Sequence, residues 1–241
     1  MIVQRLFRHL QVTILATSIL LVVIMFLNVL TGYHALGFTG LWYELDLKIE
    51  GNFATWVESV MMLLCAIPMY ALFLKASDAG WSMPSRLLFL LLTVVAIFFS
   101  ADEMLSIHEQ IQARSAVVSG LVAGTFLDGF GWVAVYAPML LAGAVLAFLA
   151  ARDILALSDT GTRRQLLRLL VTIIGAAVLI LLFEVLEAYL YSRNISREIS
   201  TIFEESMELV VINGFFGLGI RILQVADTAG SRKVPADGPG A

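Results

Sequence analysis

Four ionisable side chains lie close together at the end of a long apolar run. The stretch SADEMLSIHEQ, residues 100–110, contains Asp102, Glu103, His108 and Glu109, although only 14% of the chain is charged. Carboxylates and imidazole are the side chains that bind divalent cations and that donate or accept protons in catalysis. The stretch therefore predicts a site that handles a cation or protons.

Glutamates in three other apolar segments carry the same chemistry. They are Glu58, the pair Glu184 and Glu187 in EVLE, and Glu204, Glu205 and Glu208 in and beside ESME. Residues three or four positions apart share one face of a helix, so the members of each pair can point at the same neighbour.

The position of each side chain around a helix separates the members of the first stretch. Asp102 and Glu109 are seven residues apart and nearly eclipsed, whereas Glu103 points well away from Asp102. His108 lies about 100° from Glu109 around the helix and reaches the edge of the same site. We therefore expect Asp102, His108 and Glu109 to face the site, and we expect less of Glu103.

No lysine or arginine accompanies these acids within the apolar segments. Carboxylates held together in an apolar medium must be protonated, hydrated or neutralised by a bound cation, and a metal ion needs the fewest residues. Oxygen-rich ligation with one nitrogen favours a divalent metal such as Fe, Mn, Mg or Ca over Zn. The predicted metal ligands are Asp102, His108, Glu109, Glu184, Glu187 and Glu208, and the candidate catalytic bases are Glu58 and Glu205.

The segments that carry these acids are long enough to cross a bilayer. Hydrophobic residues make up 60% of the 241 positions, and the mean hydropathy is +0.91. The apolar residues fall into six blocks of about 20 residues, the length of a transmembrane helix. The sequence thus predicts an all-α integral membrane protein with six transmembrane helices, near 12–30, 53–74, 87–111, 132–151, 169–191 and 201–222.

Lysine and arginine set the expected orientation. With a cytoplasmic N-terminus, eleven of the 15 lie on the cytoplasmic side, and only Lys48, Arg114, Arg193 and Arg197 lie on the other. Positive charge favours the cytoplasmic side of a membrane. Both termini are therefore predicted to be cytoplasmic, in a multi-pass protein of the bacterial plasma (inner) membrane.

The predicted topology brings the acids to one level. At about 1.5 Å per residue, the acids of the second, third, fifth and sixth helices all lie within about 12 Å of the outer surface. We expect these four helices to form a four-helix core around the acids. The alternative is that the helices end earlier and that the acids are solvated residues of outer loops.

Three further segments have local predictions. The outer segment 31–52 is expected to form a short interfacial helix, and GFFGLG at 214–219 is expected to allow close helix packing. Residues 1–224 form the transmembrane domain, and the small, polar residues 225–241 are expected to be a disordered cytoplasmic tail.

These features favour one class of function and leave two others open. A metal site near the extracytoplasmic face indicates a metal-dependent membrane enzyme, a hydrolase or an oxidase, that acts on a lipidic or membrane-proximal substrate. A cation- or proton-coupled transporter and a non-catalytic ion-sensing or assembly subunit are the alternatives. The expected partner is the lipid bilayer, and nucleic acid is not expected because the chain has no long basic run.

Overall fold

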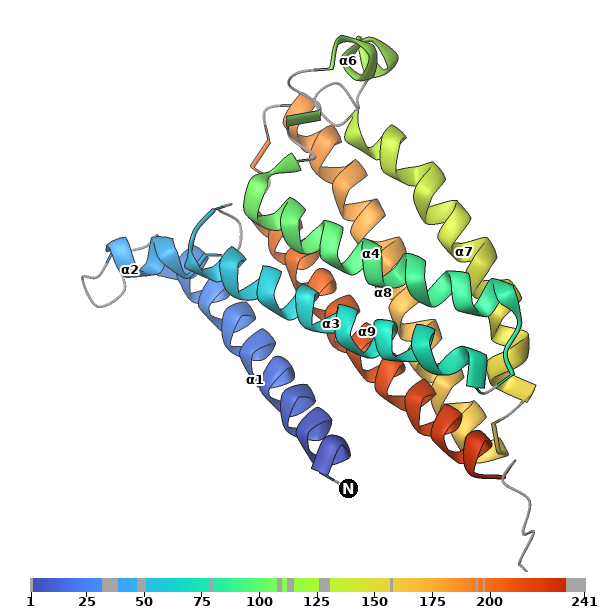
Figure 1. Ribbon diagram of the computed structural model, residues 1–241. Coiled ribbons are helices and arrows are strands. Elements are labelled where there is room, and N and C mark those ends of the chain that lie inside the picture. The colour runs from blue at the N-terminus through green and yellow to red at the C-terminus, as the bar shows by residue number, and fades with distance from the viewer. Residues whose placement is uncertain are drawn as a thin grey trace, which may run out of the picture.

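The fold is all-helical in the part of the chain that the structure describes. The structure is a computed structural model (Figure 1) and describes residues 2–31, 39–46, 51–78, 80–107, 110–111, 115–125, 131–156, 158–193, 195–196 and 198–232. Its long helices are α1 (Ile2–Thr31), α3 (Phe53–Asp78), α4 (Met83–Leu105), α7 (Trp132–Ala156), α8 (Thr160–Ser192) and α9 (Glu198–Arg232). Its short helices are α2 (Thr39–Glu44) and α6 (Ala116–Val122).

The long helices have the length and composition of membrane spans. Over the described residues, α1, α3, α4, α8 and α9 are each long and apolar enough to cross a bilayer, and α7 adds a further apolar helix of 25 residues. Val171, Ile174 and Leu182 of α8 are exposed, as expected for a lipid-facing helix. The structure confirms the all-α class and a multi-pass membrane architecture, while six crossings and cytoplasmic termini stay predictions.

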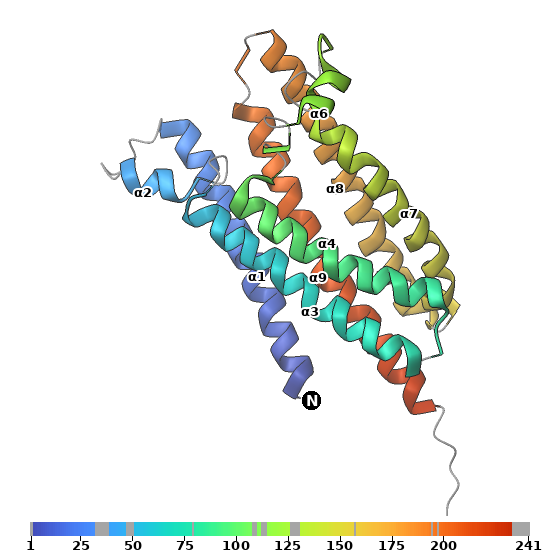
Figure 2. The same ribbon diagram turned by 45° about the horizontal axis from the view of Figure 1, so that its top comes forward.

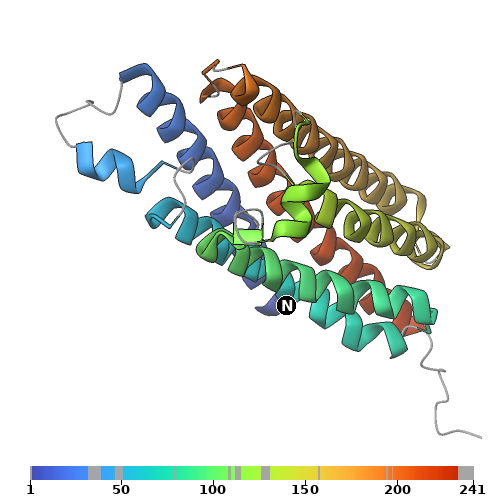
Figure 3. The same ribbon diagram turned by 90° about the horizontal axis from the view of Figure 1, so that it is seen from above.

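Helix α9 is the centre of the packing. It contacts α1, α3 and α8, while α3 also packs on α4, and α4 on α7. Seen from above, α3 and α4 lie on one side of α9 and α8 lies on the other (Figure 3). The four acid-bearing helices are therefore neighbours in the order α4, α3, α9, α8.

The two termini of the helical bundle lie at the same end. The start of α1 and the end of α9 are found there, and α6, the end of α8 and the start of α9 are found at the opposite end (Figure 1, Figure 2). An even number of crossings would produce this arrangement, in agreement with the six predicted from the sequence.

Aspartate side chains fix the starts of two helices, α4 and α8, at the end of the bundle that holds the termini. Asp159 accepts hydrogen bonds from the amide of Thr162 (3.0 Å) and from its hydroxyl (2.6 Å). The hydroxyl bond, followed by the amide bond, lowers the pKa of Asp159. Asp153 of α7 accepts from the amide of Ser82 (2.8 Å) and the hydroxyl of Ser85 (2.6 Å), so it ties the start of α4 to α7.

The segment GFFGLG lets three helices approach α9 closely, as predicted. A Cβ added at Gly214 would lie 2.7 Å from Cγ1 of Ile173 in α8, and one at Gly219 would lie 2.9 Å from Cβ of Pro68 in α3. A Cβ at Gly217 would meet a side chain of α1. Each glycine thus serves a different neighbour, because small residues allow the backbones of membrane helices to approach.

We expect Gly219→Ala to destabilise the protein. The new methyl group would overlap the ring of Pro68, which is held by its backbone and cannot swing away, and such overpacking costs about 1–3 kcal/mol. Gly143→Ala in α7 is the matched control, since its Cβ would meet nothing within 4 Å. Thermal unfolding in detergent should show a lower Tm for Gly219→Ala alone. Equal melting temperatures would contradict the close approach.

Two predicted boundaries were wrong. Helix α9 continues to Arg232, so residues 225–232 are not a disordered tail. Val225 is buried there, and Asp227 forms an ion pair with Lys75 of α3. Helix α4 ends at Leu105 rather than at residue 111, because Ser106 adopts the left-handed conformation (φ 48°, ψ 47°). Residues 233–241 lie outside the described residues.

Candidate cation site

Asn52 fixes the start of α3, the helix that carries Glu58. Its side-chain oxygen accepts a hydrogen bond from the amide of Thr55 (3.0 Å), which is the bond of a helix N-cap. Its side-chain nitrogen donates to the carbonyl oxygens of Asp46 (2.6 Å) and Tyr43 (2.9 Å). The first turn of α3 is thereby anchored to the segment that follows α2, so Glu58 is placed on a fixed turn.

Three carboxylates from two helices meet beside this turn. One carboxylate oxygen from each of Glu58, Glu205 and Glu208 lies within 4.8 Å of the other two. Glu205 and Glu208 are three residues apart on α9 and share the face that meets α3. The sequence predicted that these residues would converge, and the structure brings them together.

Glu58 is the most enclosed member of this carboxylate cluster. Its side chain is 0% exposed. Neither of its carboxylate oxygens has a hydrogen-bond partner among the residues that the structure describes. A buried carboxylate without a donor is costly unless a proton or a cation compensates it. A proton on the carboxyl group or a cation beside it would remove this cost.

Helix α4 brings Glu103 near the carboxylate cluster, whereas Asp102 faces α7. Glu103 is a charged neighbour of both Glu58 and Glu205. Asp102 is buried, and its Oδ2 accepts a hydrogen bond from the hydroxyl of Tyr136 in α7 (3.3 Å). Adjacent residues of a helix point about 100° apart, and α4 lies between α3 and α7. The sequence favours Asp102 over Glu103 as a ligand, whereas the structure places Glu103 nearer to the cluster.

The acids of α8 extend the cluster along α9. Glu187 is buried and accepts hydrogen bonds from the hydroxyls of Ser200 (3.4 Å) and Thr201 at the start of α9. Glu184 is hydrogen-bonded to Glu204. Two carboxyl groups can share such a bond only if one of them carries a proton.

Glu204 links the acids of α8 to the cluster. Its charged neighbours include Glu184 and Glu187 on one side and Glu208 on the other. Glu184 and Glu187 therefore lie next to the cluster, separated from Glu58 by the acids of α9. The role of Glu204 and the hydroxyl donors of Glu187 were not predicted from the sequence, although Ser200 and Thr201 lie within four residues of Glu204.

His108 and Glu109 lie outside the described residues, so their predicted roles as ligands stay predictions. The expectation that Asp102 and Glu109 lie on one continuous helix was wrong. Ser106 adopts the left-handed conformation and ends α4, so the register of α4 does not extend as far as position 109.

An apolar layer separates the cluster from the end of the bundle with the termini. It contains the buried residues Met61 and Cys65 of α3 and Leu209, Ile212 and Phe216 of α9. Cys65 is packed in this layer, with its Sγ 3.5 Å from the carbonyl oxygens of both Met61 and Ile212. This is the interior packing role that the sequence indicates for a lone cysteine in a span.

Asn213 is the polar residue of α9 just beyond the acids, and it turns sideways. Its side-chain nitrogen donates to the hydroxyl of Ser18 in α1 (2.7 Å) and to the carbonyl oxygen of Leu209 (2.7 Å). Its amide therefore joins α1 to α9 and does not continue the row of carboxylates.

Comparison with known protein families gives one match. A family model described as Domain of unknown function (DUF8692) matches residues 12–222. The chain belongs to this family. The matched region begins within α1, ends within α9 and includes every carboxylate of the site. No curated protein and no solved structure matches the chain.

Proposed function

We propose that this member of the family binds a divalent cation through Glu58, Glu205 and Glu208, and that it is a metal-dependent membrane enzyme. The observation that carries the proposal is the convergence of three carboxylates on Glu58, which is wholly buried and has no hydrogen-bond partner in the described residues. Glu103 lies near Glu58 and Glu205 and is a fourth candidate carboxylate ligand. We further propose that the protein lies in the bacterial plasma membrane with six crossings, cytoplasmic termini and the site near the outer face.

The donor set fits a hard divalent cation. Two oxygens on opposite sides of Ca²⁺, each about 2.4 Å from the ion, are about 4.8 Å apart. This is the largest separation that two ligands of one Ca²⁺ can have, and the three oxygens of the cluster lie within 4.8 Å of one another. Mg²⁺ holds its oxygen ligands at about 2.0–2.1 Å, so the same carboxylates would lie closer together around this smaller ion. The absence of sulfur from this donor set, with Cys65 packed elsewhere, argues against a zinc site of the cysteine type.

Charge repulsion supports a cation in the same place. Two ionised carboxylates whose nearest oxygens are no more than 4.8 Å apart repel by about 3 kcal/mol at an effective dielectric constant of 20. Three ionised carboxylates at this distance would oppose folding, because each pair adds a repulsion of this order. A divalent cation reverses the sign of these interactions.

The side chains divide into two roles around the cation. Glu58 was a candidate base from the sequence, but its complete burial suits it better to hold the ion than to meet a substrate. Glu205 is partly buried, and it can accept a proton from water or from a substrate hydroxyl. When bound, the metal would polarise a substrate oxygen or lower the pKa of a water molecule, or would activate O₂ if it is iron.

The proposed substrate is lipidic or lies at the membrane surface. A site within about 12 Å of the surface is at the level that headgroups and the first part of the acyl chains occupy. The apolar layer of Met61, Cys65, Leu209, Ile212 and Phe216 argues against a transporter. At the depth of this layer, the amide of Asn213 is held by Ser18 and the carbonyl of Leu209 and does not continue the row of carboxylates.

The test is the metal content and the chemistry of the purified protein. The protein is purified in detergent without chelator, and bound elements are counted per chain by mass spectrometry. We expect stoichiometric Fe, Mn, Mg or Ca. The protein is then placed in vesicles of mixed phospholipids, and lipid products are compared with those of Glu58→Gln.

Three outcomes separate the classes of function. Hydrolysed or oxidised lipid that depends on Glu58 supports an enzyme. Cation flux into the vesicles without lipid products would establish a transporter instead. No metal retention under any loading condition would overturn the cation site itself.

A further inference from the structure

A basic groove lies at the end of the bundle opposite to the carboxylate cluster. It has a volume of about 550 Å³ and lies between α1, α8 and α9. Arg5 and Arg8 of α1 and Arg221 of α9 line it, together with the amide side chains of Gln11 and Gln224. Three positive charges from two helices therefore surround one opening.

The positive charge of this groove is not compensated within the described part of the chain. The ion pair found there joins Lys75 to Asp227 and involves none of the three arginines. Arg221 donates a hydrogen bond to the side-chain oxygen of Gln224 (2.7 Å), which leaves its charge intact. The groove therefore attracts an anion.

The groove lies at the depth of lipid headgroups. Arg221 follows Glu208 by 13 residues on α9, which corresponds to about 20 Å along the helix. The cluster is expected within about 12 Å of one membrane surface, and the hydrocarbon layer is about 30 Å thick. The arginines are thus at the headgroup layer of the opposite leaflet.

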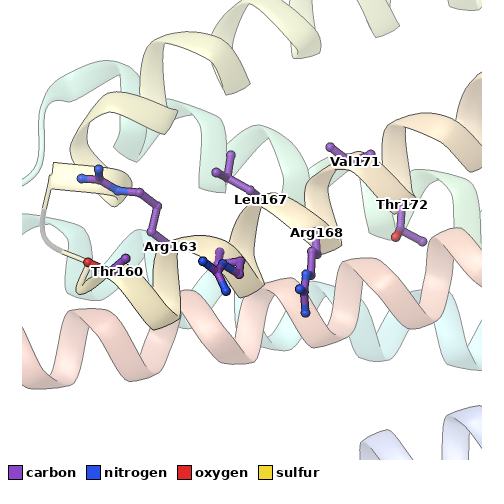
Figure 4. A pocket seen from close by; sticks show the side chains of 7 residues that line it. Thr160, Arg163, Leu167, Arg168, Val171 and Thr172 are labelled. Atoms are coloured by element: carbon purple, nitrogen blue, oxygen red, sulfur yellow. The ribbon is translucent and has the colours of Figure 1, made fainter.

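Helix α8 adds a second basic surface beside the groove. A further pocket of about 680 Å³ is lined by Arg163, Arg164 and Arg168, all within the first turns of α8. Figure 4 shows the side chains of Arg163 and Arg168 projecting from this helix. Leu169, the next residue of α8, lines the first groove. The two basic surfaces therefore adjoin along α8.

We infer that the groove between α1, α8 and α9 binds the phosphate group of an anionic glycerophospholipid. Each planar guanidinium group of Arg5, Arg8 and Arg221 can donate two parallel hydrogen bonds to two oxygens of a phosphate. Leu169 and Ile220 form the apolar part of the lining, where the first carbons of an acyl chain can lie. Basic pockets between transmembrane helices bind anionic headgroups in this way. This binding site is independent of the cation site.

The experiment compares lipid binding by wild type and by Arg8→Gln/Arg221→Gln in detergent. Phosphatidylglycerol is titrated, and binding is followed by native mass spectrometry and by the shift in Tm. We expect about a fivefold loss of affinity for each arginine, so about 25-fold for the pair. Arg152→Gln is the matched control, because it removes an exposed arginine of α7 at the same end, outside the groove.

Several results would contradict the proposed lipid-binding site. Unchanged affinity in the double variant, or an equal loss in Arg152→Gln, would show that the groove is not the binding site. Phosphatidylcholine binding as tightly as phosphatidylglycerol would remove the requirement for an anionic lipid. Inorganic phosphate that displaces the lipid at equal concentration would assign the groove to free phosphate. If the double variant does not fold, Arg8→Lys/Arg221→Lys retains the charge and is expected to bind several-fold more weakly than wild type.

Discussion

Glu58→Gln is expected to abolish retention of the bound cation. The substitution keeps the size of the side chain but replaces a carboxylate oxygen with an amide nitrogen, and it removes one of the negative charges that meet at the proposed site. Replacing a residue that only hydrogen-bonds to a metal ligand already weakens metal binding by about 10–100-fold. The loss of a ligand itself should therefore cost at least about 100-fold in affinity. Glu208→Gln should behave in the same way.

Asp102→Asn is the matched control for this substitution. It makes the same change of charge in another buried acid, one that accepts its hydrogen bond from Tyr136 on the side of α4 toward α7. We expect this variant to keep its metal, and we expect Glu103→Gln to weaken binding because Glu103 is a charged neighbour of Glu58. The measurement is metal per chain after dialysis against a fixed free-ion concentration. Metal loss in Asp102→Asn with retention in Glu58→Gln would restore the ligand set expected from the sequence.

The level of the acids was predictable because it depends on helix rise alone. Counting residues from the lysines and arginines placed Glu58 and Glu208 at one depth, and the structure brings their carboxylates together. Helix order, by contrast, follows from contacts between distant segments, and the sequence predicted a four-helix core without the order α4, α3, α9, α8.

The rotation of α4 about its own axis could not be predicted from the sequence, and the reason is physical. In a soluble protein, the polar face of a helix marks the side away from the core. In a bilayer, lipid-facing and protein-facing residues are both apolar, so the pattern carries little information about rotation. The choice between Asp102 and Glu103 depends on that rotation. It is set by packing on α3 and α7 rather than by any local signal.

The end of α4 lacked a sequence signal as well. Glycine is the usual residue in a left-handed position, and here serine occupies it. The end of α9 was missed because small polar residues resemble a tail in composition. Contacts made by Val225 and Asp227 with the rest of the bundle keep that part helical.

Removal of the cation is expected to reverse the order of stability of wild type and Glu58→Gln. With metal at about 100 times its Kd, wild type gains about 2.7 kcal/mol from binding, and chelation removes this gain. The chelated protein then contains three converging carboxylates, each pair repelling by about 3 kcal/mol if both are ionised. Glu58→Gln lacks one of these charges. It should therefore melt below metal-loaded wild type and above chelated wild type.

The comparison requires four melting curves and a control. Wild type and Glu58→Gln are each measured with excess Mn²⁺ or Ca²⁺ and with chelator, in the same detergent. Glu198→Gln removes an exposed acid in the first turn of α9, outside the cluster, and it should respond to chelation as wild type does. A cation site at Glu58 requires both the response of wild type to chelation and its absence in Glu58→Gln. Equal responses in the two proteins would mean that the stabilising ion binds elsewhere, and that Glu58 is buried for a reason unrelated to metal.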